Sequence, residues 1–319
     1  MTTFGMRPFG GLWSTSGFVQ AEKWLGRPVG WVPVMLARKE GAGTMAATAA
    51  GLWRQGGRNA IPPSISTRIE LVVAVPLAFG RTVAKTPAGI AEIGRMLDGT
   101  AAGAWDAQYR QVAVSLVDGG HGGAVVRLGH EQTGAWYPWS AVGNPVRYVA
   151  AFRHVRQVMA AVAPGLRFEY NTATSGFGAW AAAAYPGDDA VDVVGLDIYN
   201  KTVGRNPAPF PSVWARKLLP ALTAHLALAK AHGKPVSYAE WANGSRDDPG
   251  FVTNMAAWFA GLPAAGPGSL VHQAYFDAGK SGHRLANSPL TAAAYRQAFG
   301  RVARTVGDLW RDKLGPLGR

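Results

Sequence analysis

The chain has 319 residues, of which 48% are hydrophobic and 16% are charged, so it can form a large core and extended disorder is not expected. It contains no cysteine, which excludes disulfides, cysteine nucleophiles and thiolate metal sites. The formal net charge is +13, but the Lys and Arg residues are scattered without a basic run between aromatic residues, so we do not expect nucleic acid as a partner.

Short apolar stretches alternate with longer alanine-rich stretches along the chain. The short stretches predict β-strands at residues 9–13, 29–36, 70–76, 123–128, 167–171, 191–199, 235–240 and 269–276. The longer ones predict helices at residues 43–55, 86–97, 104–119, 146–163, 212–232, 249–262 and 291–313. The strands are almost continuously apolar, as in a parallel sheet covered by helices on both faces. Eight repeats without a long linker predict an α/β fold, a single (β/α)8 TIM barrel in which residues 1–319 form one catalytic domain.

The two ends of the chain give expectations about location. No stretch of about 18 apolar residues is present, so we expect no membrane span. Residues 1–11 show no signal peptide, which leaves a secreted or periplasmic protein in trimmed mature form, or a cytoplasmic one. The basic residues of 301–319 have helical spacing and predict a solvated helix face, with attraction to an anionic polysaccharide as the alternative.

Carboxylates and aromatic residues gather where the predicted strands end, which is where barrel enzymes build their active sites. Glu131 follows the fourth strand and Glu240 ends the seventh. Cleavage of a glycosidic bond needs two carboxyl groups that flank the bond. Aromatic rings near the same strand ends are candidates to stack on sugars, each by burying about 150–250 Å²; they are Trp136, Tyr137, Trp139, Trp180 and Trp241.

Other polar residues at these strand ends are candidates for the pocket. Arg127 lies four residues before Glu131 and is placed to pair with a carboxylate and keep it ionised. Tyr199 could donate a hydrogen bond to the nucleophile, and His130 could contact the nucleophile or the sugar. Asn171, at the end of the fifth strand, is a further candidate for substrate binding. No His pair with metal-ligand spacing is present, so we expect no metal and no cofactor.

The spacing Arg-x-x-His-Glu-x-x-Gly-x-Trp-x-x-Trp, at residues 127–139, resembles the acid/base segment of glycoside hydrolase family 26, the β-mannanase family. Residues 191–199 and 234–241 are similar to the family's sixth strand and nucleophile strand, and residues 9–13 to its opening strand. The resemblance implies a (β/α)8 barrel in which Glu131 is the acid/base and Glu240 the nucleophile. It also implies that Arg127, His130 and Tyr199 line the pocket, and that Trp136 and Trp139 shape the sugar subsites.

One departure from the family pattern concerns Thr133, where the family usually has Asn. A shorter hydroxyl here replaces an amide that can both donate and accept. The predicted function is a retaining endo-β-glycosidase acting by double displacement on β-mannan or a related β-glycan, an anionic exopolysaccharide included. Two alternatives stay open: a carbohydrate-binding barrel without turnover, and a transglycosylase or exopolysaccharide-processing enzyme. We expect a monomer whose partner is the polysaccharide or an oligosaccharide.

Overall fold

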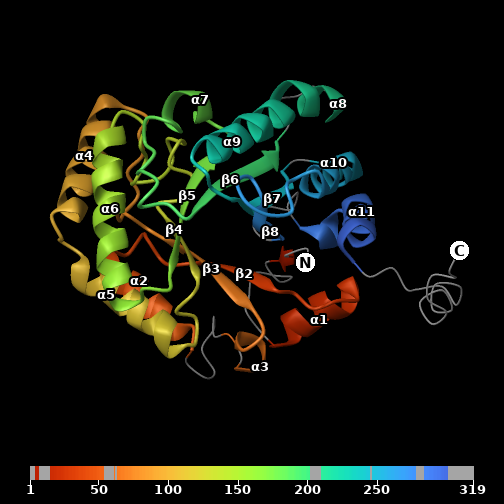
Figure 1. The fold of residues 1–319 in the computed structure, drawn as a ribbon, viewed down its shortest axis with the longest axis horizontal. Helices are drawn as coiled ribbons and strands as arrows, with labels where there is room; N and C mark the ends of the chain where they lie inside the picture. Colours follow the sequence, from red (N-terminus) through yellow and green to blue (C-terminus); the bar gives the residue numbers. More distant parts are fainter. Residues whose placement is uncertain are drawn as a thin grey trace, which may run out of the picture.

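The computed structural model contains a closed barrel of parallel strands, paired in chain order from β1 to β8, with β8 completing the ring against β1 (Figure 1). The structure describes residues 4–6, 15–53, 61, 63–201, 210–244, 246–277 and 284–300. The strands are β1 (Phe4–Met6), β2 (Trp31–Met35), β3 (Glu70–Val75), β4 (Val125–Leu128), β5 (Arg167–Ala173), β6 (Val193–Asn200), β7 (Val236–Asn243) and β8 (Leu270–Tyr275). The predicted (β/α)8 barrel is therefore confirmed.

Helices surround the strands (Figure 1). Those before β5 are α1 (Thr15–Leu25), α2 (Ala42–Gly51), α3 (Pro63–Ser66), α4 (Pro87–Ala101), α5 (Asp106–Asp118) and α6 (Pro145–Val162). Those after β5 are α7 (Phe177–Trp180), α8 (Phe210–Val213), the π-helix η1 (Trp214–Leu218), α9 (Leu219–Ala231), α10 (Pro249–Ala260), the 3₁₀-helix η3 (Leu285–Asn287) and α11 (Pro289–Phe299). Local sequence fixes several of their starts: the side chain of Thr86 accepts from the N–H of Gly89 at α4, and that of Asp248 from the N–H of Gly250 at α10.

One predicted helix is divided in the structure, and two other predicted elements lie outside the described residues. The first predicted strand, residues 9–13, lies outside the described residues, and the strand that the structure describes there is β1. The single helix expected over residues 212–232 is divided into α8, η1 and α9, because Pro220 lacks the N–H that would continue a regular α-helix through η1. The basic residues 301–319 also lie outside the described part of the chain.

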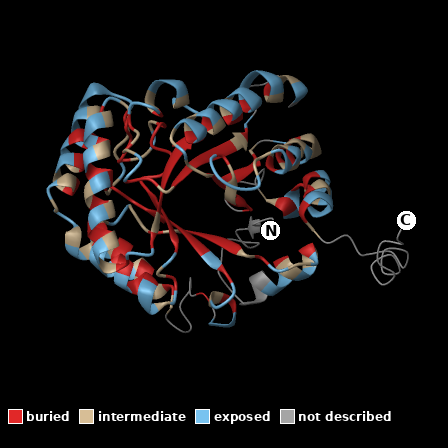
Figure 2. Ribbon diagram, in the orientation of Figure 1, coloured by how far each residue is buried: buried red, intermediate tan, exposed pale blue. Residues whose placement is uncertain are grey.

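The strands are buried on both faces, whereas the helices expose their outer sides (Figure 2). In β3, residues 71–75 are at most 2% exposed, as expected for the continuous apolar run. Charged residues are also buried inside the barrel, among them Arg127, Glu169 and Asp197. Burying so many charges is costly unless they pair with one another, so their clustering on β4 to β7 indicates a functional site. No described helix combines the length and the apolar composition that a membrane span requires.

Candidate active site

Glu131 lies three residues beyond the end of β4 in a strained turn. Its φ angle is +52°, and no other non-glycine residue in the described ranges has a positive φ. Such backbone costs about 1–3 kcal/mol and is retained where the surroundings enforce it, most often at functional sites. Here the backbone N–H of Glu131 donates to the side-chain oxygen of Asn171 on β5, at 2.8 Å. Asn171 therefore fixes the turn that holds the Glu131 carboxyl group in place.

The Glu131 side chain is nearly buried, with 9% exposed, and lies against Trp136. The indole N–H of Trp136 donates to Glu131 Oε2 at 2.6 Å. Gly134 makes this possible, because a Cβ at that residue would lie 2.3 Å from the Trp136 ring. Burial and the negative charge of Glu240 raise the pKa of Glu131 to about 7, although the hydrogen bond from Trp136 opposes them. A substantial fraction of this carboxyl group is therefore protonated at neutral pH.

Glu240 lies on β7 in a different electrostatic environment. Arg127 Nη1 donates to its Oε1 at 3.0 Å, and the Tyr199 hydroxyl donates to its Oε2 at 2.8 Å. Burial alone would raise the pKa of Glu240, but the positive charge of Arg127 and these two hydrogen bonds outweigh burial and lower it. Burial first, and then the nearby carboxylates, raise the pKa of Tyr199, so its phenol keeps the proton that it donates. Glu240 is therefore held ionised.

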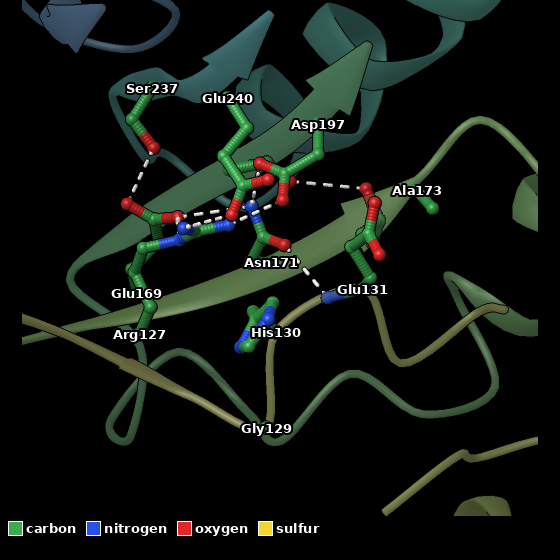
Figure 3. Close-up of polar contacts among 12 residues, drawn as sticks. Arg127, Gly129, His130, Glu131, Glu169, Asn171, Ala173, Asp197, Ser237 and Glu240 are labelled. Carbon is green, nitrogen blue, oxygen red and sulfur yellow. Dashed lines mark hydrogen bonds and ion pairs between the residues drawn. The ribbon is translucent and has the colours of Figure 1, made fainter. Parts of the chain in front are cut away.

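Arg127 lies at the centre of the cluster, and three carboxylates converge on its guanidinium (Figure 3). Its Nε donates to Glu169 Oε1 at 3.1 Å, and its Nη2 to Asp197 Oδ2 at 2.5 Å, in addition to the bond with Glu240. One cation cannot balance three adjacent anions in a buried site. Burial raises the pKa of Asp197 well above its usual value despite Arg127, and Glu240 raises it further. The protonated form is therefore favoured at Asp197, whereas the ionised form is favoured at Glu169 and Glu240.

Glu169 is a site residue that the sequence did not single out. It is completely buried and accepts hydrogen bonds from Arg127, from Ser237 Oγ at 2.8 Å and from His272 Nε2 at 3.1 Å. Burial would raise its pKa, but the hydrogen bond from His272 and the charge of Arg127 lower it. Gly195 leaves room for it, since a Cβ there would lie 2.3 Å from Glu169 Oε1. Glu169 lies two residues before Asn171 on β5, so strand alternation turns both to the same side, and this is the signal that could have identified it.

His130 is buried beside the two glutamates. Burial and the charge of Arg127 lower its pKa to about 3, so its ring is neutral. The ring packs edge-on against Tyr137 at 4.7 Å and lies 5.3 Å from Trp139. Neither ring nitrogen has a hydrogen-bond partner in the described part of the chain. A neutral imidazole with free donor and acceptor positions can bind a sugar hydroxyl.

Four residues expected to contact substrate are buried by the protein. Trp241 is 0% exposed, because neighbouring strand residues point to opposite sides and Glu240 takes the pocket side. Trp139 is also 0% exposed, stacked on Tyr137 at 4.5 Å while its N–H donates to the His130 carbonyl. Asn171 and Arg127 are at most 1% exposed and use their polar groups on protein partners. Trp139, Trp241 and Asn171 are therefore enclosed by protein in this structure, while Arg127 pairs with the Glu240 carboxylate, as its place before Glu131 predicted.

Among the predicted substrate-binding residues, Trp136 is the most exposed. Trp136 keeps 37% of its surface exposed while it binds Glu131, so part of the side chain is accessible to a sugar. Thr133, the departure from the family pattern, is 1% exposed. Its hydroxyl donates to the carbonyl of Ala173 and accepts from the N–H of the same residue, at 3.0 and 2.9 Å.

In the described ranges no group of three His, Asp or Glu side chains is arranged to bind a metal.

Comparisons with known proteins agree with this geometry. The family model "Glycosyl hydrolase family 26" matches residues 44–260, which include both glutamates. Endoglucanase H of Acetivibrio thermocellus is 30% identical over 187 residues; the match covers 54% of this chain but 19% of that much longer protein. The resemblance read from residues 127–139 and 234–241 is thereby confirmed.

Solved structures share the fold over most of the chain. The catalytic domain of an endo-β-1,4-mannanase from Bacillus sp. JAMB-750 superposes with a TM-score of 0.62 and 15% identity, covering 93% of this chain and 85% of that one. An endo-β-1,4-mannanase double mutant from Cellulomonas fimi gives a TM-score of 0.65 and 15% identity, covering 97% and 74% of the two chains. At this identity the likeness establishes the barrel fold alone.

Proposed function

The chain belongs to glycosyl hydrolase family 26, and we propose that it cleaves a β-linked polysaccharide with retention of anomeric configuration, using Glu131 and Glu240. The observation that carries the proposal is that the pKa values of two neighbouring carboxyl groups are shifted in opposite directions. The pKa of Glu131 is raised to about 7, whereas Arg127 holds the pKa of Glu240 below its usual value. Acid and nucleophile in a retaining glycosidase need this difference, because one must hold a proton and the other must be ionised.

In the first step, a Glu240 carboxylate oxygen attacks the anomeric carbon and the glycosidic C–O bond breaks. The proton on Glu131 passes to the departing oxygen, which leaves as a free hydroxyl. Arg127 and Tyr199 hold the attacking carboxylate in one orientation through their bonds to its two oxygens. The product of this step is a glycosyl ester on Glu240.

In the second step, the ionised Glu131 removes a proton from water, and that water attacks the anomeric carbon of the ester. The C–O bond to Glu240 breaks, which restores its carboxylate and releases a sugar of unchanged configuration. Loss of the Glu240 charge in the ester lowers the pKa of Glu131, because that charge is one of the two causes of the raised value. Glu131 is thereby converted from acid to base when the reaction requires it.

The backbone of the substrate is proposed from the relatives. Two structural relatives are described as endo-β-1,4-mannanases and one sequence relative as an endoglucanase. β-1,4-Linked mannan and glucan, cut within the chain, are therefore the first substrates to test. The exposed part of Trp136 supports this choice, because the flat C–H face of a pyranose stacks on an exposed indole.

The test is release of reducing ends from mannan, mixed-linkage glucan, β-1,3-glucan and xylan by wild type, Glu240→Ala and Glu131→Ala. We expect one polymer to be cut, and each variant to lose at least about 100-fold in activity. Glu92→Ala is the matched control. Glu92 is an exposed carboxylate on α4 that accepts a hydrogen bond from the Thr82 hydroxyl, and the variant should keep full activity. Full activity in Glu240→Ala would refute the assignment.

The same assay separates the two alternatives. Longer oligosaccharides among the products would indicate a transglycosylase, whereas binding without any product would indicate a barrel that only binds. Thr133 gives the binding-only alternative no support, because its side chain is buried and hydrogen-bonded to the backbone of Ala173.

A further inference from the structure

Lys201 and Arg38 lie near the two glutamates, where their charges act on Glu131 and on His130 respectively. Lys201 follows directly after β6, and Arg38 lies three residues beyond β2. Neither takes part in an ion pair within the described ranges, although Arg68, Arg153 and other surface cations do. An arrangement of this kind favours a partner that brings the missing negative charge.

Lys201 is exposed, and its ammonium lies over the Tyr199 ring, with Nζ 4.6 Å from the ring centre. The hydroxyl of the same ring binds Glu240 at 2.8 Å. Because both contacts involve the Tyr199 ring, Lys201 Nζ lies within about 10 Å of the Glu240 carboxylate. This is about the distance over which salt at physiological concentration screens a charge. A charged substituent on a sugar at the cleavage point, or on the next sugar, lies within reach of Lys201.

Arg38 stands at the opposite wall. Its guanidinium lies over Tyr137, 5.0 Å from the ring centre, and Nη1 donates to the carbonyl of Gly80 at 3.1 Å. A guanidinium has five N–H donors, so this single bond leaves others for a ligand. Its charge reaches the pocket, because it adds to burial and Arg127 in lowering the pKa of His130.

The topology places the two cations on opposite sides of the barrel. β2 and β6 are four strands apart in a closed ring of eight, and both cations follow the carboxyl ends of these strands, as Glu131 and Glu240 do on β4 and β7. A polysaccharide that crosses the rim with its scissile bond at the glutamates meets a positive side chain on either hand. Arg127 already binds three carboxylates, so of these three cations Lys201 and Arg38 are the two without an ion-pair partner in the described ranges, and the charge of Lys201 also acts on Glu131.

We propose that the substrate is a β-glycan bearing anionic groups, uronate carboxylates or sulfate esters, which Lys201 and Arg38 bind on either side of the scissile bond. The net charge of +13 would add to this by raising the concentration of such a polymer near the protein. The proposal deepens the proposed function and rests on it for its cleavage readout, while its binding readout does not depend on turnover.

The experiment compares one neutral β-glycan with two derivatives of the same backbone, one partly oxidised at C6 to uronate and one partly sulfated. Cleavage (kcat/KM) and equilibrium binding are measured for wild type, Lys201→Gln, Arg38→Gln and Lys230→Gln. Lys230 is an exposed cation in the last turn of α9, on the outside of the barrel, and serves as the matched control. The two derivatives distinguish a carboxylate from a sulfate as the preferred group.

We expect wild type to prefer a charged derivative, and this preference to disappear in about 1 M NaCl, where the screening length is about 3 Å. Lys201→Gln and Arg38→Gln should each lower the ratio of charged to neutral kcat/KM about two- to fivefold, as for a partly exposed ion pair, while Lys230→Gln leaves it unchanged. If Arg38→Gln fails to fold, Lys201→Gln decides alone.

Two results overturn the inference: equal or better use of the neutral polymer without salt dependence, or the same loss of preference in Lys230→Gln as in Lys201→Gln. Glutamate-dependent cleavage of the neutral polymer alone would leave the proposed function standing without the charged substrate. Binding of the charged polymer that depends on salt and on Lys201, without any cleavage, would support the charged ligand and refute the proposed function.

Discussion

Single side chains control the protonation of this site. Trp136 and Glu240 act on Glu131 in opposite directions: the indole N–H stabilises the ionised carboxyl group, whereas burial and the charge of Glu240 disfavour it. The balance places the pKa of Glu131 at about 7. If Glu131 must donate a proton, activity falls as pH rises through this value.

Trp136→Phe removes the hydrogen bond and should raise the pKa of Glu131, because the bond favours the ionised form. The basic limb of the pH profile of kcat/KM is then expected at higher pH than in wild type. Trp105→Phe, at an exposed tryptophan before α5, is the control and should not move the limb. A limb that stays in place, or moves to lower pH, would show that Glu131 is not the group that titrates.

Glu131 also affects stability. Its folded-state pKa of about 7 lies above the ordinary 4.5, so between these values the folded protein retains a proton that the unfolded chain releases. Stability from this group is therefore lost as pH rises through that window and is not regained above it. Glu131→Gln should raise the free energy of unfolding at pH 8 by up to about 3 kcal/mol, with little gain at pH 4. Equal gains at both pH values, measured by urea unfolding, would contradict the shift.

Glu169 acts through Arg127, and Gly195→Ala tests this without changing a charge. The new Cβ would lie 2.3 Å from Glu169 Oε1 and 2.9 Å from Asn171 Nδ2, so both side chains must move. We expect a loss of about 1–3 kcal/mol in unfolding free energy and a fall in kcat. Gly178→Ala in α7, where a Cβ meets nothing within 4 Å, is the control. Wild-type kcat in Gly195→Ala would show that the orientation of Glu169 is unimportant.

At the scale of the elements, irregular strand pairing orients the carboxylates. The register between β6 and β7 shifts between Gly195 and Ile198, the interval that contains Asp197. The register between β7 and β8 shifts between Tyr238 and Trp241, the interval that contains Glu240. Bulges re-aim side chains and are frequent beside active sites. The loop after β4 is in turn held to β5 by Asn171 and Thr133.

Thr133→Val tests the connection between this loop and β5. The substitution keeps the shape but leaves the buried carbonyl and N–H of Ala173 without their partner, at a cost of about 1–3 kcal/mol. Thr253→Val, at an exposed helix residue whose hydroxyl binds only the Pro249 carbonyl, should cost far less. Equal effects of the two substitutions on thermal unfolding would remove Thr133 from the support of the loop.

Strands made of a continuous apolar run could be predicted from the sequence. The apolar run of β3 predicted a strand buried on both faces, and its bounds agree to within a residue. Trp241 shows where the reading failed: adjacency to Glu240 suggested a shared pocket, whereas alternation along a strand turns neighbours to opposite sides. Glu169 was missed because three of its partners, Arg127, Ser237 and His272, come from the three strands β4, β7 and β8, and only the barrel brings them together.

At the scale of the whole molecule, the barrel brings β4 and β7 to one rim and so assembles an acid and a nucleophile from residues 109 positions apart. The monomeric state stays a prediction, to be measured by light scattering, and so does the location, either secreted or periplasmic as a trimmed mature form or cytoplasmic. The central claim concerns chemistry: a glycosyl ester forms on Glu240 during turnover.

Trapping this intermediate with a 2-deoxy-2-fluoro glycoside of the preferred sugar is the most direct test, because the fluorine slows breakdown of the ester. Mass spectrometry should find one added glycosyl group, on the peptide that contains Glu240, and the product first formed by the uninhibited enzyme should keep the β configuration. An adduct on another residue, or an α-configured product without any adduct, would contradict the account.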